Sequence, residues 1–435
     1  MKSARNTLPT EPVNGITCGI DWARDDHAVS IVDAKGREVT RKTITHDAAG
    51  LRDLLTTLDR AGAREVAIER PDGPVVDTLL EGGITVVVIS PNQVKNLRGR
   101  YGSAGNKDDR FDAFVLADTL RTDRARLHPL LPDTPGTTAL RQTCRARKDL
   151  VAHRVAVANQ LRAHLKIVFP GAVGLFAAID SPISLAFLTR FDCQDRADWL
   201  SVTRLAAWLA NASYSGRTHP RELHRRLTSA PRATNEVTGA EITAAFVATL
   251  TALNTQISVL DDSIADQLAA HADAHIFTSL PRSGTLRAAR LLSEIGDCRA
   301  RYPTPEALAC LAGVAPSTRQ SGKITHVGFR WAADKQLRDA VCDFAGDSRH
   351  ANPWAADLYL RARVIGHDHP HAVHASWPAP GSTSSGTAGK TTPPTTPPTT
   401  GHSNNCSTDP NPGRLDTGQL TRPASLFPAP YQVNH

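Results

Sequence analysis

The sequence predicts an α/β domain at the N-terminus, a helical connector, a mainly α C-terminal domain and a disordered tail. Three observations predict this order: strand-like and helix-like patterns alternate over residues 15–125, heptad-like apolar spacing marks 138–270, and residues 376–435 contain 11 Pro and 18 Ser/Thr. A segment of that last composition buries too little apolar area to offset the entropy of ordering it, so we expect a disordered tail.

The first domain is expected to begin with three strands, since the turn sequence Asp33-Ala34-Lys35-Gly36 separates two strand-like runs. A β-α-β-α pattern follows, and residues 91–110 are expected to be a charged loop. The strand-like runs are 16–22, 27–32, 37–44, 66–69 and 84–90, and the helical ones are 48–61, 74–81 and 109–121. An antiparallel hairpin before alternating strands and helices matches a ribonuclease H-like domain, of which RuvC is one form, better than a purely parallel sheet.

The connector, residues 138–270, contains two apolar seams of similar length around an insert at 170–238. Val151 to Val168 and Phe246 to Ile264 each repeat apolar residues at steps of three and four. This pattern indicates an antiparallel coiled coil or a dimerisation stalk, and ordinary helical-bundle packing explains it equally well. A compact C-terminal domain is expected over residues 275–373.

Composition narrows the class of protein. Fifty Lys and Arg against 43 Asp and Glu give a formal net charge of +7, which favours a polyanionic partner. The seven Cys never occur in CxxC spacing, which argues against a zinc ribbon or a disulfide scaffold and fits a reducing cytosol. The longest strongly apolar run, 84–89, is too short to span a bilayer, so a soluble intracellular protein with no membrane partner is expected.

Four acidic residues stand at matching ends of the predicted elements. Asp21 ends the first strand, Glu69 ends the fourth, and Asp109 and Asp112 begin the last helix. The first and fourth strands are neighbours in a ribonuclease H-like sheet, and residues i and i+3 share one helix face. Clustered carboxylates repel one another unless a cation neutralises them, and their hard oxygens suit Mg²⁺ or Mn²⁺. Paired metal ions of this kind catalyse in-line phosphoryl displacement.

A serine and several cations complete the candidate residues. Ser321 precedes Gly322 in a basic loop, where its hydroxyl needs a base, a metal or cations nearby to attack phosphorus. Residues 141–166 carry seven Lys and Arg against the single acid Asp149. The cations that we expect to contact nucleic acid are Lys107, Arg110, Arg145, Lys148, Arg319, Lys323 and Arg330.

With these residues in view, the chain resembles transposases of the insertion-sequence 110 family, the DEDD recombinases guided by a bridge RNA. The matching motifs are Gly19-Ile20-Asp21 with His27 six residues on, Ile68-Glu69, Lys107-x-Asp109-x-x-Asp112-Ala113, the segment 291–297, and Gly313-Val314-Ala315-Pro316 followed by Ser321-Gly322. Each motif is modest, but their order and spacing make the combination specific. The resemblance extends over about residues 15–365.

The resemblance implies a RuvC-like N-terminal domain, a coiled-coil connector and a C-terminal transposase domain. The acidic tetrad of the family falls on Asp21, Glu69, Asp109 and Asp112, and its catalytic serine on Ser321. It further implies Mg²⁺-dependent DNA strand exchange by dimers or tetramers that bind a guide RNA, in the bacterial cytoplasm and at the nucleoid. In the family the serine becomes covalently linked to the cut DNA end.

Three other interpretations stay open at this point. The acids alone fit a RuvC-type metal-dependent nuclease that forms no covalent serine intermediate. An ATP-binding domain of the actin-like superfamily also begins with a hairpin after an early Asp, but it needs Gly-rich phosphate loops that the sequence does not show. The abrupt change to a Pro/Thr-rich segment after Val373 also fits an inactive nucleic-acid-binding remnant with a decayed C-terminus.

Overall fold

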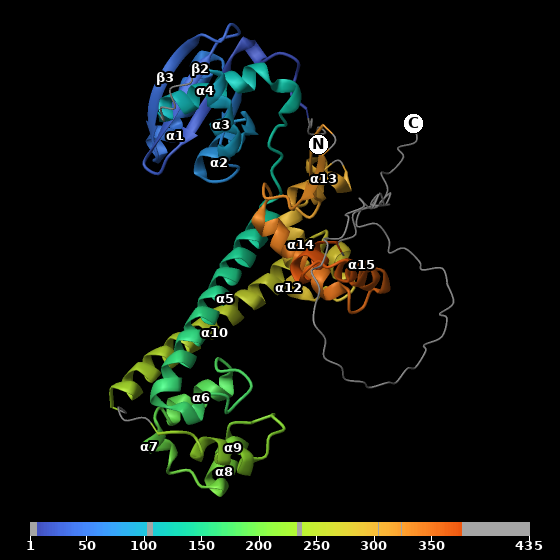
Figure 1. Ribbon diagram of the computed structural model, residues 1–435. Helices are drawn as coiled ribbons and strands as arrows, with labels where there is room; N and C mark the ends of the chain where they lie inside the picture. Colours follow the sequence, from blue (N-terminus) through green and yellow to red (C-terminus); the bar gives the residue numbers. More distant parts are fainter. Residues whose placement is uncertain (1–6, 102–107, 233–236, 303, 323, 376–435) are drawn as a thin grey trace, which may run out of the picture. The chain divides into compact units, whose positions relative to one another are not determined.

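The computed structural model describes residues 7–101, 108–232, 237–302, 304–322 and 324–375 (Figure 1). The chain forms two compact units, and the expected disordered tail lies outside the described residues. Within the described residues, the first unit combines the chain up to Asp133 with Cys298–Pro303, and the second combines Thr134–Asp297 with the chain from Thr304 onward. The short segment 298–303 therefore belongs to the first unit although it lies far along the sequence.

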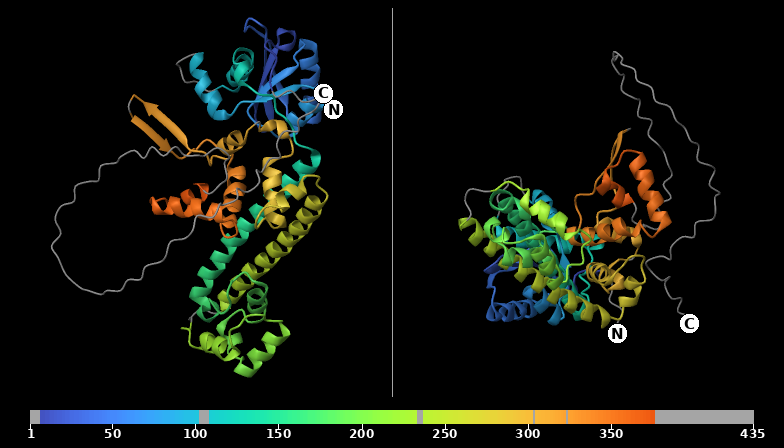
Figure 2. Two further views of the ribbon diagram at one scale, coloured as in Figure 1. Left: turned by 90° about the vertical axis from the view of Figure 1, so that its right-hand side faces the viewer. Right: turned by 90° about the horizontal axis from the view of Figure 1, so that it is seen from below.

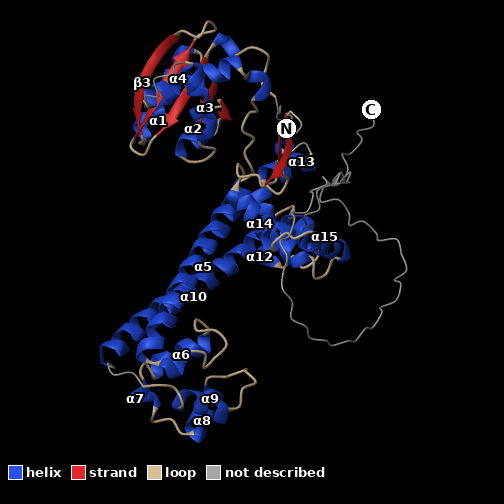
Figure 3. Ribbon diagram, in the orientation of Figure 1, coloured by secondary structure: helices blue, strands red, loops and turns tan. Residues whose placement is uncertain are grey.

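A five-stranded mixed sheet forms the centre of the first unit (Figure 3). Its strands are β1 Thr17–Trp22, β2 Asp26–Val32, β3 Glu38–Thr45, β4 Glu65–Ile68 and β5 Thr85–Val88. The spatial order is β3-β2-β1-β4-β5, in which β1, β2 and β3 pair antiparallel while β4 and β5 continue parallel to β1. This topology confirms the predicted ribonuclease H-like arrangement, with the first and fourth strands as neighbours.

Helices cover both faces of this sheet. They are α1 Ala48–Ala61, α2 Pro74–Glu81, α3 Pro91–Leu97 and α4 Asp109–Thr122, with short 3-10 turns η1 Val13–Gly15, η2 Arg98–Arg100, η3 Arg124–Arg126 and η5 Arg299–Arg301. Residues of α1 and α2 share one apolar core with the sheet, and residues of α3 and α4 share another. The prediction of a continuous loop over 91–110 was wrong, because Ser90 and Gln93 form a capping box and Pro91 occupies the first turn of α3.

Helix α4 packs unusually close to β1, and Gly19 makes this approach possible. A Cβ atom added at Gly19 would lie 2.1 Å from the carbonyl oxygen of Ala113 and 2.5 Å from the amide nitrogen of Ala117. Thr17 reinforces the contact, because its hydroxyl donates a 2.9 Å hydrogen bond to the Ala117 carbonyl. The missing side chain at Gly19 thus lets the backbone of α4 lie directly on β1.

Two histidines fix the chain at the end of β1. The buried His27 accepts a 3.4 Å hydrogen bond at Nδ1 from the Ala23 amide, so its proton is on Nε2, which donates to His46 Nδ1 at 2.8 Å. Burial and the neighbouring His46 lower the pKa of His27, and Asp26 opposes them less strongly. The pair therefore holds a neutral imidazole against the turn that follows Trp22.

The second unit is built on two long helices that run antiparallel, α5 Pro135–Val168 and α10 Val237–Ala269 (Figures 1 and 2). Pairs such as Arg147 with Asp261, Thr143 with Gln267 and His164 with Thr243 join them along their length. Both apolar seams predicted from the sequence lie in these helices. By length and composition alone, Gly239–Ala269 is the one segment of the described chain that would suffice to cross a membrane.

The insert between these helices forms one apolar core together with residues of α5 and α10, among them Leu161, Leu165 and Leu250. Its elements are η4 Pro170–Ala172, α6 Pro182–Arg190, α7 Gln194–Ala197, α8 Val202–Asn211 and α9 Pro220–Thr228. Rings of Phe169, Phe176, Phe187, Phe191 and Trp208 contact one another in this core at centroid distances of 5.1 to 6.5 Å. Such aromatic packing accounts for an insert in which the sequence showed helical patches but no motif.

The remainder of the second unit is mainly helical. It contains α11 Ala274–Thr278, α12 Thr285–Ile295, α13 Pro305–Leu311, α14 Lys335–Ser348, α15 Pro353–Val364 and α16 His369–Ala375, and a hairpin of β6 Ser317–Ser321 and β7 Ile324–Gly328. The hairpin occupies the segment that the sequence indicated only as a basic loop.

We predict that Gly19→Ala loosens the contact between β1 and α4. Overpacking against rigid backbone typically costs about 1–3 kcal/mol and occasionally more, and here the added atom meets two backbone groups. Hydrogen–deuterium exchange of the peptides spanning β1 and α4 is expected to accelerate. Gly99→Ala is the matched control, because a Cβ at Gly99 meets nothing within 4 Å; equal exchange in the two variants would contradict the packing argument.

We also predict a pH dependence of stability that His27 contributes. The unfolded chain binds a proton at this position near pH 6.5, whereas the folded protein resists it, so the free energy of unfolding falls as the pH drops below about 6.5. His27→Gln removes this titrating side chain, so the difference in proton binding between the folded and unfolded states becomes smaller. Its urea midpoint for the first unit, measured by pulse proteolysis between pH 7.5 and 5, is expected to fall less steeply than that of the unsubstituted protein; parallel curves would refute this.

Candidate metal centre and serine hairpin

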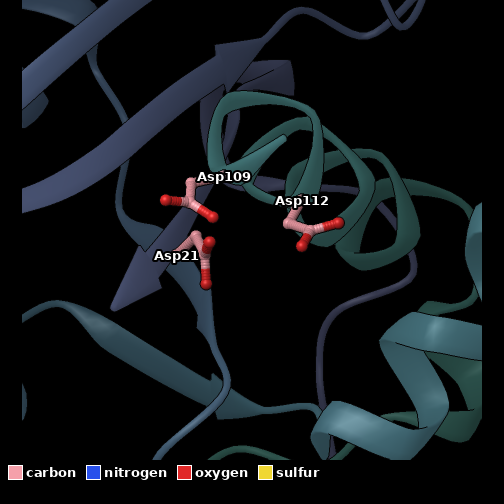
Figure 4. A group of neighbouring side chains, drawn as sticks. All are labelled: Asp21, Asp109 and Asp112. Carbon is pink, nitrogen blue, oxygen red and sulfur yellow. The ribbon is translucent and has the colours of Figure 1, made fainter. Parts of the chain in front are cut away.

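Three of the four predicted acids meet at one end of the sheet (Figure 4). Asp21 is the penultimate residue of β1, while Asp109 and Asp112 occupy the first turn of α4. The i, i+3 spacing places both helix residues on one face, and the close packing of α4 over Gly19 brings that face to the end of β1. Asp108 caps the helix through the Arg110 amide, so the two inner acids need not act as caps.

The geometry of this cluster suits a single divalent cation. One carboxylate oxygen from each of Asp21, Asp109 and Asp112 lies within 4.8 Å of the other two. Oxygen ligands bind Mg²⁺ at about 2.0–2.1 Å and Ca²⁺ at about 2.3–2.6 Å, so two ligands of one ion are at most about 4–5 Å apart. Asp21 and Asp112 are buried and Asp109 is exposed, which leaves one side of the cluster open to solvent.

Glu69, the fourth predicted acid, is adjacent in the sheet but is not a member of this cluster of three. It follows directly after β4, and the parallel register pairs Ile20 with Ile68, so the next residues along the two strands are Asp21 and Glu69. Its side chain is half-buried. The strand pairing thus puts Glu69 on the strand next to Asp21, and its part in the cluster stays a prediction.

Arg98, one of the basic residues in the segment expected to be a charged loop near the acids, contacts the cluster directly. Its Nε donates a 2.5 Å hydrogen bond to Oδ1 of Asp112, and an Nη donates to Oδ2 of the same carboxylate. Its role was not predicted, because Arg98 lies in η2, inside the segment 91–110 that was expected to be a loop. Of the two nearby cations that were predicted to contact nucleic acid, Arg110 is exposed beside Asp109, and Lys107 lies outside the described residues.

An aromatic and histidine cluster adjoins the end of β1. Trp22 follows Asp21 and lies against His27, with ring centroids 6.2 Å apart, and the guanidinium of Arg70 lies 4.5 Å from the Trp22 ring centroid. His46, which holds His27, comes just after β3. These residues pack where β1, β3 and β4 end, a convergence that spacing along the sequence did not indicate.

Ser321 lies at the tip of the exposed hairpin in the second unit. It ends β6, pairs with Ile324 of β7, and precedes Gly322, whose φ of 56° makes the tight turn possible. Arg319 lies on the same strand face as Ser321 and pairs directly with His326. Arg319 and Ser321 are both exposed, no acidic residue occurs from 307 to 333, and Lys323 lies outside the described residues.

The base of this hairpin is fastened by arginines. Arg330 donates to the carbonyls of Ala315 and Pro316, and Arg338 donates to those of Ala312 and Arg330. The Arg338 guanidinium also lies 4.5 Å from the ring centroid of Phe329. Arg330, predicted as a nucleic-acid contact, thus holds the hairpin at the body of its own unit.

The basic stretch of α5 is largely paired within the protein. Arg145 forms a two-point ion pair with the buried Glu294, and Lys148 contacts Asp339 and Gln336. Arg141 donates to the Ser293 carbonyl, and Arg147 pairs with Asp261. The two cations predicted to bind nucleic acid here, Arg145 and Lys148, therefore already have acceptors within the second unit.

Comparison with known protein families gives two matches. A transposase family model matches residues 18–170, and the model of the transposase IS116/IS110/IS902 family matches residues 274–360. The first match includes all four predicted acids, and the second includes Ser321. The segment between the two matches contains α6 to α9 of the insert and all of α10.

Individual relatives align along most of this chain. The mini-circle putative transposase for IS117 of Streptomyces coelicolor is 35% identical over 371 residues, which are 81% of this chain and 89% of that protein. An uncharacterized protein of insertion element IS900 from Mycobacterium paratuberculosis is 27% identical over 83% of this chain and 92% of its own length. Among solved structures, T. thermophilus RuvC in complex with a Holliday junction substrate aligns with a TM-score of 0.22 and 18% identity, covering 26% of this chain and 99% of RuvC. From the identity across nearly the full length of a relative and the family matches in both units, the chain belongs to the IS116/IS110/IS902 family of transposases.

Proposed function

We propose that this transposase cuts and rejoins DNA strands to move an insertion sequence, using a divalent cation held by its acidic residues and Ser321 as the nucleophile. The observation that carries this proposal is the convergence of Asp21, Asp109 and Asp112, from two elements far apart in the sequence, within 4.8 Å of one another. Three carboxylates carry more negative charge than the single guanidinium of Arg98 neutralises, and their oxygens are hard ligands that suit Mg²⁺ or Mn²⁺.

All four acidic residues are proposed to bind the cation. Asp21, Asp109 and Asp112 would be ligands, and Glu69 would complete the set, a role supported by the pairing of Ile20 with Ile68 in the adjacent strands. A bound Mg²⁺ supplies Lewis-acid stabilisation of the charge that develops on phosphoryl oxygens. The exposed Asp109 and Arg110 stand on the open side, where a DNA phosphate can approach.

Ser321 is proposed to attack the phosphorus atom of the DNA strand. A bond forms between its Oγ and phosphorus as one bond from phosphorus to a deoxyribose oxygen breaks, and the proton lost by the hydroxyl is balanced by one gained by the leaving oxygen. The exposed tip of the hairpin presents this hydroxyl, and Arg319 on the same face can neutralise phosphate charge.

The partners follow from the family and from the exposed cations. DNA contacts are proposed for Arg110 and Arg319, and for Lys107 and Lys323 of the adjoining segments, whereas Arg145, Lys148 and Arg330 already bind acceptors of the protein. Recognition of the DNA sequence is proposed to depend on base pairing with a guide RNA, and catalysis on a dimer or tetramer. These last two points are supported by the resemblance to the insertion-sequence 110 family.

We predict that Asp21→Asn abolishes both cation binding and strand cleavage. Losing one anionic ligand removes stabilisation of several kcal/mol from the charged transition state, which corresponds to a rate loss of about 10³-fold or more. Titration calorimetry with Mn²⁺ checks binding, and cleavage of element-end DNA with its guide checks activity. Asp25→Asn is the control, since the Asp25 side chain is 93% exposed; cleavage retained in the Asp21 variant would overturn the proposed metal site.

We predict that Ser321→Ala prevents a covalent protein–DNA adduct while leaving Mn²⁺ binding unchanged, because the serine is not a member of the acidic cluster. The adduct is sought by denaturing gel electrophoresis of reactions with labelled DNA. Ser317→Ala is the matched control on the same strand face, with its hydroxyl directed to the Gly328 carbonyl. Cleavage by the protein without any adduct would instead identify a metal-dependent nuclease in which water is the nucleophile.

A further inference from the structure

Arg98 binds the carboxylate of Asp112, which the proposed cation site needs as a ligand. Both oxygens of Asp112 accept hydrogen bonds from its guanidinium, so each oxygen has a cationic donor in the direction of η2. A divalent cation requires a lone pair of at least one of these oxygens at a distance of about 2 Å. A guanidinium stays protonated at any ordinary pH, so it must move aside rather than lose its charge.

The burial of the two side chains shows which of them can move. The side chain of Asp112 is 2% exposed and lies in the first turn of α4, packed on β1. The side chain of Arg98 is 25% exposed and extends from a single 3-10 turn between α3 and the start of α4. Arg98 therefore has solvent to enter, whereas Asp112 is fixed where the other two carboxylates meet it.

We propose that Arg98 is a positioning residue of the metal site, which holds Asp112 in the cation-free protein and yields that carboxylate to the cation on binding. The inference rests on the proposed function, since it takes the acidic cluster as a cation site. Arg98 keeps the buried Asp112 oriented and neutralised before the cation arrives, because a buried carboxylate without a partner is strongly destabilising. The same contact weakens cation binding, because the ion competes with a guanidinium for the same oxygens.

The chain offers a matched pair on the same helix. Arg121 binds Asp118 near the other end of α4, and the exposed fractions of the two side chains, 24% and 10%, resemble those of Arg98 and Asp112. Arg121 thus pairs with an acid outside the cluster, at a site where no competing cation is proposed. Arg121→Ala removes a comparable ion pair and tests whether loss of an ion pair on α4 is by itself enough to change cation affinity.

The test compares Mn²⁺ binding by the full chain and by Arg98→Ala, Arg98→Lys and Arg121→Ala, using titration calorimetry and the electron paramagnetic resonance signal of free Mn²⁺. We expect Arg98→Ala to bind about tenfold more tightly than the unsubstituted protein, since one charged hydrogen-bonded pair no longer competes. Arg98→Lys keeps the charge but loses the two-point contact, so its Mn²⁺ affinity is expected to lie between those of Arg98→Ala and the unsubstituted protein. Arg121→Ala is expected to bind as the unsubstituted protein does.

Thermal unfolding in the presence of a chelator separates positioning from simple destabilisation. Both alanine variants are expected to melt at a lower temperature, but added Mn²⁺ is expected to raise the melting temperature of Arg98→Ala by more than that of Arg121→Ala. If Arg98→Ala fails to fold, Arg98→Lys gives the answer by calorimetry. Unchanged or weaker Mn²⁺ affinity in the folded Arg98 variants overturns this inference alone, whereas absence of binding in every protein, the unsubstituted one included, overturns the proposed metal site as well.

Discussion

The close contact between α4 and β1 is the constraint on which the site depends. Asp21 belongs to the strand, Asp109 and Asp112 belong to the helix, and their oxygens meet only because the helix backbone lies directly on the strand at Gly19. Because protein interiors are densely packed, α4 cannot easily move away from β1, and the acids of the two elements keep their relative positions. The glycine in the Gly19-Ile20-Asp21 motif thus has a packing role two residues before the acid that it helps to place.

Much of the first unit was predictable from the sequence, because period-two and period-3.6 patterns report directly on burial. The strands, α1, α2 and α4 lie where these patterns placed them, and the three clustered acids follow from strand ends and i, i+3 spacing. The contacts of Arg98 and His46 were not predictable, because each depends on where a side chain points after a turn. Helix α3 was missed because it is two turns long and mostly exposed, so that it has almost no apolar period; its capping box and initial proline were the available signal.

The long helices show the opposite limit of sequence reasoning. A run of seven cations with one acid on α5 is typical of a nucleic-acid-binding surface when it is considered alone. In the folded unit, acids from three other elements, Asp261 of α10, Glu294 of α12 and Asp339 of α14, pair with Arg147, Arg145 and Lys148. The excess of positive charge on α5 therefore reflects ion pairs that join α5 to its neighbours in the second unit. By contrast, the hairpin around Ser321 contains no acidic residue, and its Arg319 is exposed.

The return of residues 298–303 to the first unit affects how the polypeptide can be dissected. The side chain of Asp133 is fully buried, pairs with Arg301 and accepts a hydrogen bond from the Cys298 amide, while Arg301 also donates to the Leu131 carbonyl. A fragment ending at residue 133 would lose all three of these contacts and leave a sequestered anion without its arginine. A first unit that is produced by itself must therefore contain residues 298–303 in addition to the N-terminal fragment.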